Sequence, residues 1–289
     1  MIQNLKGYSG CILEKYEKNG NNFVRKISRD FNYNRRLKKQ CLKQLNFKGN
    51  DYILTPKISN YGILNNLFYF DMEYINAPLF YDVLFSMQDD EIEFYINILL
   101  KNLSINKIKK NTQQNFIFNK KINSMQNEFD SRNLNNDLFN FSIEKLKNFD
   151  WTRIPNSDCH GDLTLQNILL KDDNIYVIDL LDSFYNSWMF DVSRILQDLE
   201  LGWSYRFKEL NQKQKDKILF AKNILIKNIS NINFSSENSL MLESIYYVLL
   251  NDITRIYSYA KDELTINFLN NALEKLINIL STKKFLNHD

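Results

Sequence analysis

Short runs of apolar residues, separated by polar turn signals, characterise the first 75 positions of the chain. Residues 11–16 and 23–28 are two such runs, and each has the length and the β-branched and aromatic content of a strand. The segment 18–22 between them contains an Asn-Gly pair, which is typical of a tight turn between strands. The pattern therefore predicts two strands joined by a tight turn.

A helix and two further strands complete this strand-rich region. Leu37, Cys41 and Leu45 recur every four residues within the basic segment 33–46, and this spacing predicts one amphipathic helix. The stretch from Tyr61 to Ile75 then contains two more strand-like runs, which are interrupted at Asn65-Asn66.

From Ala77 onward the apolar residues follow the spacing of helices. In residues 79–103, Leu, Phe and Ile recur at helical spacing, and residues 207–289 contain three further helical patterns. Residues 104–150 are rich in Lys, Asn and Gln, and we expect solvated helices and loops there. The lysines of this stretch are interpreted as a solvated face: Lys107, Lys109, Lys110, Lys120 and Lys121.

Composition excludes several classes of protein. Hydrophobic residues make up 44% of the chain and aromatic residues 14%, which is enough for a large globular core. A net charge of +3, from 37 basic and 34 acidic residues, lacks the strong positive field of a general nucleic-acid-binding protein. No apolar run approaches the ~18 residues that a membrane helix needs. We therefore expect neither nucleic acid nor a membrane span.

Cysteine usage and codon bias indicate the cell compartment and source. Cys11, Cys41 and Cys159 are an odd number and far apart, so we expect reduced thiols. The first residues lack the apolar region of a signal peptide. Asn, Ile and Lys, which have A/T-rich codons, are abundant, whereas Ala is scarce. A cytoplasmic, bacterial protein is the resulting expectation.

The segment from Asp158 to Arg206 contains the residues with recognisable chemistry. It includes a strand over 167–170, a polar turn and a second strand over 175–179. Asp162 and Asn167 stand at the start of this hairpin and Asp179 ends it. Because a hairpin brings its open ends together, the three polar side chains are expected to converge.

Such a constellation suits phosphoryl transfer from a nucleotide. This reaction needs oxygen ligands for magnesium and a carboxylate that orients the attacking hydroxyl. Asn167 and Asp179 supply the first requirement. Asp162 supplies the second, because it precedes Asn167 by five residues, as the catalytic aspartate does in the kinase catalytic loop.

The run HGDLTLQNIL from His160 to Leu169, followed by Ile178-Asp179, resembles the aminoglycoside phosphotransferase and choline kinase family. The resemblance implies an α+β, two-lobed, protein-kinase-like fold. Residues 1–76 would form a small nucleotide-binding N-lobe with an antiparallel sheet. Residues 77–289 would form a larger, mainly helical C-lobe for catalysis and acceptor binding.

The resemblance also implies roles for individual residues. Asp162 would be the catalytic base, supported by His160, and Asn167 and Asp179 would bind Mg²⁺. Asp191 would brace the catalytic loop from the start of a helix, although an ordinary N-cap is the alternative.

Further nucleotide-binding residues follow from the same resemblance. Gly7 and Gly10 lie where a loop would cover the ATP phosphates, and Lys26 matches the lysine that contacts these phosphates. The neighbouring Arg25 is the alternative candidate for this contact with the phosphates. The alternation of side chains along the strand does not decide between Arg25 and Lys26. The backbone of Glu73 and Ile75 would meet the adenine at the hinge, where a buried strand end is the other interpretation.

One position departs from the kinase pattern. Kinases pair the strand lysine with a glutamate on the following helix, but Gln40 occupies this position and no Glu occurs between Glu17 and Glu73. An amide can hydrogen-bond to Lys26 but cannot form an ion pair with it. A catalytically weak, nucleotide-binding pseudokinase is therefore kept as an alternative.

The sequence favours a small molecule over a protein as the acceptor. It has no Ala-Pro-Glu element after Asp179, and Leu180-Leu181 follows Asp179 where a protein kinase has Phe-Gly. Acidic and basic residues are balanced from Asp191 onward, which disfavours polycationic aminoglycosides.

A sugar or polyol is the leading acceptor class, and the expected enzyme is a small-molecule kinase that uses ATP and Mg²⁺. The alternative acceptors are aminoglycosides and choline or another amino alcohol. Choline would need an aromatic cage, for which Trp188, Trp203 and Tyr205 are available unless they are core residues. The candidate acceptor-binding residues are Asp182, Trp203, Tyr205 and Arg206, and Arg206 either binds an anionic group or pairs with a neighbouring acid.

Overall fold

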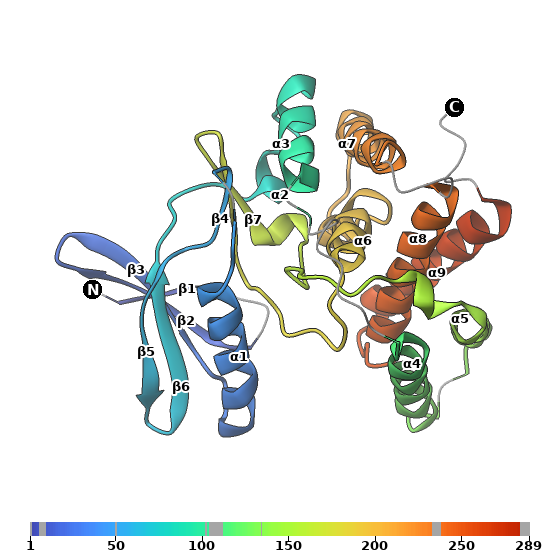
Figure 1. The fold of residues 1–289 in the computed structure, drawn as a ribbon, viewed down its shortest axis with the longest axis horizontal. Coiled ribbons are helices and arrows are strands. Elements are labelled where there is room, and N and C mark those ends of the chain that lie inside the picture. The colour runs from blue at the N-terminus through green and yellow to red at the C-terminus, as the bar shows by residue number, and fades with distance from the viewer. Residues whose placement is uncertain are drawn as a thin grey trace. The chain divides into compact units, whose positions relative to one another are not determined.

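A five-stranded antiparallel sheet, in the order β1-β2-β3-β6-β5, occupies the N-terminal part of the computed structural model (Figure 1). Its strands are β1 (Gln3–Leu5), β2 (Ile12–Lys18), β3 (Asn21–Ile27), β5 (Ile58–Leu64) and β6 (Leu67–Glu73). The structure describes residues 2–5, 10–49, 51–101, 103, 112–133, 135–232 and 238–283.

The predicted tight turn and the predicted interruption at Asn65-Asn66 are both turns with a left-handed backbone conformation. Asn19 and Gly20 connect β2 to β3 with φ values of 53° and 76°. Asn65 and Asn66 connect β5 to β6 with φ values of 49° and 64°. Two consecutive residues with positive φ match the twist of the flanking strands, and Asn and Gly tolerate this conformation best.

The predicted amphipathic helix is α1 (Asn34–Leu45), and its apolar side packs on the sheet. Leu37 and Cys41 lie one turn apart and are fully buried, whereas Leu45, the third member of the predicted stripe, is exposed at the end of the helix. They share a core cluster with Phe70 and Met72 of β6. The burial of this stripe fixes which face of α1 meets the sheet.

A second, three-stranded sheet holds the hairpin that the sequence predicted. Its order is β4-β8-β7, with β7 (Ile168–Lys171) antiparallel to β8 (Asn174–Val177). The two-residue strand β4 (Ile53–Leu54) pairs in parallel with β8 and has no counterpart in the sequence prediction. Helix α2 (Phe80–Val83) follows an isolated bridge between Leu79 and Leu169. Residues 1–83 and 160–184 together form one compact unit.

Residues 84–159 and 185–289 form the second compact unit, which is helical. Its helices are α3 (Asp89–Lys101), α4 (Gln114–Asp130), α5 (Asp137–Asn148), α6 (Trp188–Leu199), α7 (Gln212–Ser230), α8 (Asn238–Tyr257) and α9 (Glu263–Thr282). The last three confirm the three helical patterns predicted after residue 207. Short 3₁₀ turns in the chain are Phe31–Tyr33, Trp151–Arg153, Leu165–Asn167 and Trp203–Tyr205.

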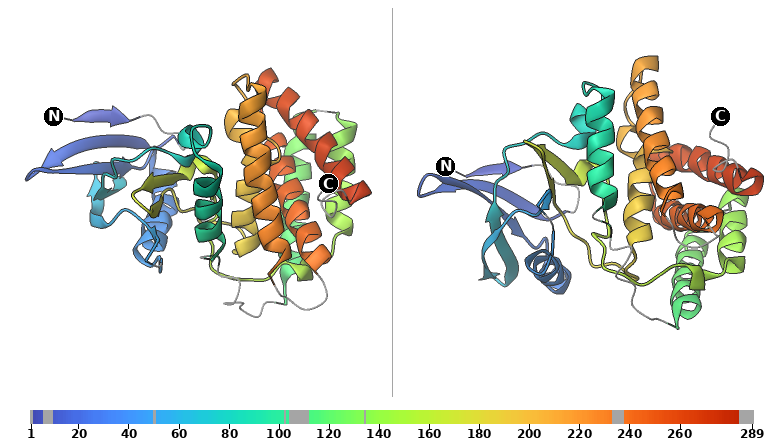
Figure 2. Two further views of the ribbon diagram at one scale, coloured as in Figure 1. Left: turned by 90° about the horizontal axis from the view of Figure 1, so that it is seen from above. Right: turned by 45° about the horizontal axis from the view of Figure 1, so that its top comes forward.

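Helix α6 is the centre of the second unit, because every one of its residues is buried. It packs against α7 and α8, and α9 packs against α8 (Figure 2). Ion pairs with a buried carboxylate join these helices: Arg194 of α6 bonds to Asp252 of α8 at 3.1 Å, and Glu200 at the end of α6 accepts from the half-exposed Lys275 of α9. Charges that are removed from water need such partners.

The Lys- and Asn-rich region contains the helices that we expected there. Phe118, Ile122, Met125 and Phe129 form a fully buried stripe along α4, and the other faces of the helix carry mainly polar residues together with the exposed Phe116. Of the lysine cluster, Lys107, Lys109 and Lys110 lie outside the described residues, whereas Lys120 is exposed and Lys121 is half-buried. Among the described helices, none combines the length and apolar character needed to cross a bilayer.

The structure therefore confirms the predicted α+β fold class, with an N-terminal antiparallel sheet and helix and a mainly helical C-terminal part. The functional boundary between residues 76 and 77 stays a prediction.

Candidate active site

The open end of the β7–β8 hairpin joins Asp162 to Asn167. The amide of Ile178 donates to the carbonyl of Asn167 at 3.0 Å, which extends the hairpin ladder by one pair. The Asn167 Nδ2 atom donates to the Asp162 carbonyl at 2.7 Å and to Asp162 Oδ2 at 3.2 Å. The predicted base and the first predicted metal ligand are thus hydrogen-bonded to each other.

Asp179 follows this hairpin with a left-handed backbone, φ = 60°. Such a conformation is uncommon for a residue other than glycine, and it tends to occur at functional sites. The Asp179 carboxylate lies 2.9 Å from the ammonium group of Lys26. The hairpin end is therefore connected to β3 of the large sheet.

Lys26 is buried, with only 1% of its surface exposed. Its ammonium group donates to Asp179 and, at 3.3 Å, to Gln40 Oε1. Burial lowers the pKa of Lys26, but the Asp179 carboxylate counteracts this effect, and the net shift of the pKa is upward. Lys26 is accordingly a charged group held inside the protein.

Arg25, the competitor of Lys26, is bound on the opposite face of β3. Its guanidinium makes two hydrogen bonds to Asp71 on β6, at 2.7 and 2.9 Å. It also stacks on the ring of Tyr69, 4.5 Å from the ring centroid. Asp71 is the cross-strand partner of Arg25 in the ladder. Lys26, not Arg25, faces the hairpin end.

Gln40 occupies the position opposite Lys26 that the sequence assigned to it. Its side chain is buried, accepts from Lys26 and donates to the hydroxyl of Tyr33 at 3.4 Å. The contact is a neutral amide in place of a carboxylate, so Asp179 is the anion that faces Lys26.

His160 connects the catalytic loop to the end of β8. Its Nδ1 atom accepts from the amide of Asp162 at 3.2 Å, and its Nε2 atom lies 2.8 Å from the carbonyl of Ile178. This pattern requires the hydrogen to be on Nε2. Burial, with the charge of Lys43 nearby, lowers the pKa of His160 to about 3, so the ring is neutral at physiological pH.

Gly161 lies where the catalytic loop and the segment after Asp179 come closest. Its φ is 92°, and a Cβ atom there would lie 2.5 Å from Ser183 Oγ and 2.8 Å from the Leu181 carbonyl oxygen. Only glycine fits both the backbone and the space. Lys43 of α1 reaches the same point and donates to the Leu181 carbonyl. Sequence reasoning missed Lys43, because its partner is remote in the sequence.

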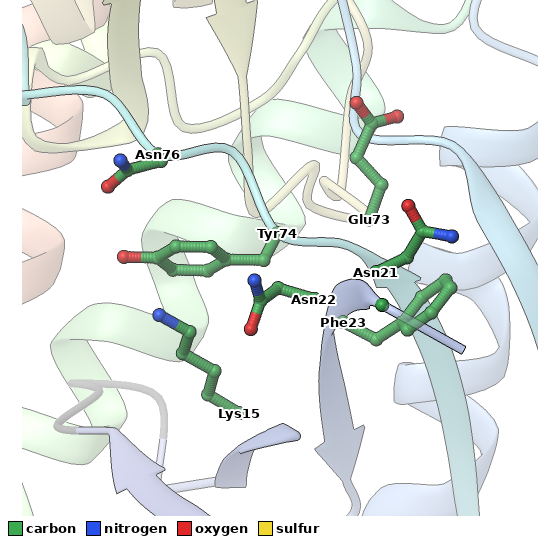
Figure 3. A pocket seen from close by; sticks show the side chains of 8 residues that line it. Lys15, Asn21, Asn22, Phe23, Glu73, Tyr74 and Asn76 are labelled. Atoms are coloured by element: carbon green, nitrogen blue, oxygen red, sulfur yellow. The ribbon is translucent and has the colours of Figure 1, made fainter. Parts of the chain in front are cut away.

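The predicted hinge borders a cavity of about 450 Å³ at the end of the β2–β3 hairpin (Figure 3). The lining residues are Lys15, Gly20, Asn21, Asn22, Phe23, Glu73, Tyr74 and Asn76. The Lys15 ammonium group points toward the Tyr74 ring and lies 3.8 Å from its centroid. Lys15 is the cross-strand partner of Val24, so both side chains share the face of Lys26. Sequence analysis did not single out Lys15.

The hinge residues differ in the state of their backbone groups. The Glu73 amide donates to the Lys57 carbonyl at 2.9 Å, so this amide is already engaged. The Ile75 carbonyl accepts from Ala77, and within the described part of the chain no backbone hydrogen bond comes from the Ile75 amide. The side chain of Ile75 is buried, as the strand-end interpretation also expects.

The glycine loop is only partly described. Gly7 lies outside the described residues, and Gly10 has a φ of 74°. Their contact with nucleotide phosphates stays a prediction.

Asp191 lies in the first turn of α6 and is buried. The N-cap of this helix is Ser187, whose hydroxyl accepts from the amide of Met189. The capping alternative for Asp191 is therefore wrong, and its bracing role stays a prediction.

The candidate acceptor residues have diverse surroundings. Tyr205 is 2% exposed and packs on Phe85, and Trp188 is 1% exposed, so both are core residues. Arg206 stacks between Trp203 and Phe207, at 4.1 and 4.4 Å from the two ring centroids. The exposed Asp182 carboxylate bonds to Lys39 of α1 at 2.7 Å.

The donor set at the hairpin end suits magnesium better than a transition metal. Across the described residues, no three His, Cys, Asp or Glu side chains gather in a metal-binding cluster. The predicted ligands are one amide and one carboxylate. Hard oxygen donors of this kind, few in number, match the preference of Mg²⁺, which keeps most of its waters.

Comparison with solved structures identifies the fold. Aminoglycoside phosphotransferase APH(4)-Ia superposes with a TM-score of 0.64 at 10% sequence identity, over 98% of this chain and 93% of that chain. The chain has the protein-kinase-like fold. A thermostable mutant of the same phosphotransferase, in ternary complex with ADP and hygromycin B, gives a TM-score of 0.63 at 10% identity, covering 98% and 94% of the two chains.

A third structure with this protein-kinase-like fold is the Plasmodium vivax ethanolamine kinase Pv091845. It matches with a TM-score of 0.61 at 14% identity, over 98% of this chain and 83% of that chain. No protein-family model matches the sequence, and no curated protein does so. The fold that the HGDLTLQNIL resemblance implied is confirmed, whereas identities this low establish nothing about the substrate.

Proposed function

We propose that this protein is an ATP-dependent phosphotransferase of the aminoglycoside phosphotransferase and choline kinase family, and that it acts on a hydroxyl group of a small molecule. The observation that supports this function best is one connected network. Asn167 bonds to Asp162, Asp179 pairs with Lys26, and the hairpin ladder joins the two pairs through Ile178. A base, a cation and metal ligands are the parts that phosphoryl transfer requires.

Asn167 and Asp179 would hold the magnesium ion. The hydrogen-bond network fixes which atom of the Asn167 side-chain amide is nitrogen and which is oxygen. The Nδ2 atom is hydrogen-bonded to Asp162, so Oδ1 is the side-chain atom that remains for a metal. Bound magnesium would neutralise negative charge on the nucleotide phosphates.

Asp162 would orient the acceptor hydroxyl and accept its proton. Its hydrogen bonds with Asn167 and with the ring of His160 fix the position of the loop. Lys26 would contact the phosphates of ATP, because it is charged, buried and directed toward Asp179. Positioning and charge stabilisation supply most of the catalysis in this class of reaction.

The adenine would bind at the hinge. The Glu73 carbonyl is an acceptor for an exocyclic amine, and the Ile75 amide is a donor for a ring nitrogen. The cavity beside Tyr74 is part of the same unit and lies on the face of the sheet that carries Lys26. Lys15 and Tyr74 would form its outer wall.

The acceptor is a sugar or polyol in this proposal. The balance of acids and bases after residue 191 gives a polycation no net attraction. A choline cage from Trp188 and Tyr205 is disfavoured, because these rings are buried in the core. Asp182 and Arg206 remain the candidate polar contacts. Cys11, Cys41 and Cys159 are not joined in disulfides, which suits the reducing cytoplasm.

The test is a panel of acceptors incubated with the protein, ATP and Mg²⁺. Monosaccharides, polyols, amino alcohols, choline and aminoglycosides are scored by ADP release and by the mass gain of one phosphate. We expect a sugar or polyol to gain phosphate, and chelation of the metal to abolish the gain. Aminoglycosides as the sole products would overturn the charge argument, and choline alone would favour an aromatic cage.

Gln40 supports a second candidate, a nucleotide-binding pseudokinase, because Lys26 lacks the glutamate partner of active kinases. The two functions are separated by the same panel. Binding of Mg²⁺–ATP without phosphate gain in any hydroxyl compound would establish the pseudokinase.

A further inference from the structure

Helix α1 carries an unusual distribution of charge for a helix that faces an active site. It contains Arg35, Arg36, Lys38, Lys39 and Lys43 and not one acidic residue. Gln40 is the neutral member of the helix that meets Lys26. Helix α1 has no carboxylate that could form an ion pair with Lys26. Any ionic contact of α1 with the active site must therefore come from the lysines and arginines of the helix.

Two of these cations contact the segment that follows Asp179. Lys39 and Lys43 are four residues apart and therefore lie on one face of α1. Lys39 pairs with the Asp182 carboxylate at 2.7 Å, and both side chains are about half exposed, so this contact is weak. Lys43 is half-buried and donates to the backbone carbonyl of Leu181. A hydrogen bond from a charged donor in a less exposed place is the stronger of the two.

The Leu181 peptide is the point where the metal segment meets the catalytic loop. Its amide donates to the His160 carbonyl at 3.0 Å, and its carbonyl accepts from Lys43. The neighbouring Gly161 leaves only the space of a hydrogen there, since a Cβ would lie 2.8 Å from the Leu181 carbonyl oxygen, and it would also lie 3.3 Å from the Lys43 ammonium group. Lys43 therefore closes a packed junction between residues 160–161 and 181.

We propose that Lys43 is a positioning residue for phosphoryl transfer: from α1 it holds the segment 179–183 against the catalytic loop and so fixes Asp179 for magnesium. The contact gives α1 a link to the active site that does not depend on a Lys26–glutamate ion pair. This inference rests on the proposed function for its kinetic consequence, but its structural part stands without it.

The test compares Lys43→Met with Lys38→Met as the matched control. Lys38 is exposed on the same helix, and its substitution removes the same charge without touching Leu181. The first readout is hydrogen–deuterium exchange of the ligand-free protein. Peptides covering 160–164 and 178–183 should exchange at least several-fold faster in Lys43→Met and unchanged in Lys38→Met.

The second readout is calorimetric titration of Mg²⁺ into protein with bound nucleotide. We expect roughly tenfold weaker apparent Mg²⁺ affinity in Lys43→Met, unchanged metal-free nucleotide binding, and substantial recovery in Lys43→Arg, which keeps a charged donor. If Lys43→Met does not fold, the variants Lys43→Arg and Lys43→Gln are compared instead, because they place a charged and a neutral hydrogen-bond donor at the same position.

Equal exchange of residues 178–183 in the Lys43 and Lys38 variants would overturn the inference. So would unchanged Mg²⁺ affinity in Lys43→Met when the unmodified protein binds Mg²⁺–ATP. If the unmodified protein binds no nucleotide, the proposed function fails, and the exchange comparison alone decides whether Lys43 positions the segment.

Discussion

Asp162 is the residue on which transfer should depend while nucleotide binding does not. It is bonded to Asn167 but lies outside the Lys26–Asp179 pair. We expect Asp162→Asn to keep the affinity for ATP and to lower phosphate transfer by ~100- to 10,000-fold, the range of general acid–base contributions. Steady-state kinetics and equilibrium nucleotide binding measure the two effects separately.

Asp173→Asn is the control for this variant, because Asp173 is an exposed residue in the turn of the same hairpin. It should match the unmodified protein in both assays. Near-normal turnover of Asp162→Asn with its true acceptor would show that the base has been assigned incorrectly.

Gln40→Glu probes the departure from the kinase pattern. The new carboxylate would lie beside the Lys26 ammonium group, which now faces Asp179. We expect it to share the lysine and free Asp179 for the metal, so that the affinity for Mg²⁺–ATP rises several-fold. A fall in both ATP affinity and turnover would mean that the site is built around an amide.

The positions of the candidate residues relative to one another were predictable from the sequence only where the motif is local. Asp162, Asn167 and Asp179 stand at the ends of one hairpin, so their spacing is sufficient to predict that they converge. Alternation along β3 could not choose between Arg25 and Lys26. The choice depends on Asp71 and Asp179, which lie far away in the sequence and bind opposite faces of the strand.

At the scale of elements, the junction at Gly161 makes a prediction about stability. Gly161→Ala introduces a Cβ into a backbone of positive φ and into contact with Ser183 and Leu181. Gly20→Ala is the matched control, since φ is 76° there and no atom lies within 4 Å of the new Cβ. Positive φ alone costs about 1–2 kcal/mol, and the overlap at Gly161 adds a penalty of about 1–3 kcal/mol.

Chemical denaturation of the two variants measures the difference. We expect Gly161→Ala to lose more free energy of unfolding than Gly20→Ala. Equal losses would show that the junction relaxes freely and that the close approach of the loops is unimportant.

Elements with a strong periodic pattern were predicted well, and those defined by tertiary pairing were not. The turns at Asn19-Gly20 and Asn65-Asn66 and helix α1 carry local signals. Strand β4 has two residues and no alternation, and it exists because β8 offers a parallel edge to it. A pairing of this kind cannot be derived from periodicity.

For the helical unit as a whole, Glu200 provides a pH-dependent test. Its carboxylate is 3% exposed and accepts from Lys275 at 2.8 Å and from Tyr246 at 2.9 Å. Burial raises the pKa of Glu200, but Lys275 and Lys222 counteract this effect, and the net shift of the pKa is downward. Because the unfolded state then binds the proton more tightly, this stability is present above the ordinary pKa of ~4.5 and is lost as the pH falls through the folded value.

Glu200→Gln should therefore destabilise the protein by about 2 kcal/mol at pH 7, since it takes from Lys222 and Lys275 the buried carboxylate that they share, and by less near pH 3. Glu274→Gln, an exposed acid on α9, is the control. Denaturation at the two pH values checks the prediction. A loss for Glu200→Gln that does not depend on pH would contradict the assigned ionisation.

The fold of the whole chain was predictable because one ten-residue motif is specific to a fold, even though the solved structures with this fold share only 10–14% identity with the chain. The spacing of apolar residues also predicted correctly that a sheet comes first along the chain and that most helices follow it. The packing of the helical unit was not predictable. Contacts such as Glu200 with Lys222 and Lys275 join helices whose sequence patterns say nothing about their neighbours.

The proposed function requires that Asp162, Asn167, Asp179 and Lys26 form one magnesium-dependent phosphoryl-transfer site. The most direct measurement is the transfer of labelled γ-phosphate from ATP to the best acceptor, with Mg²⁺ and with chelator, for the unmodified protein and for Asp179→Asn. We predict transfer with Mg²⁺, none with chelator, and a loss in Asp179→Asn that excess Mg²⁺ partly restores. Transfer that persists without a divalent metal, or that survives intact in Asp179→Asn, would contradict the proposed function.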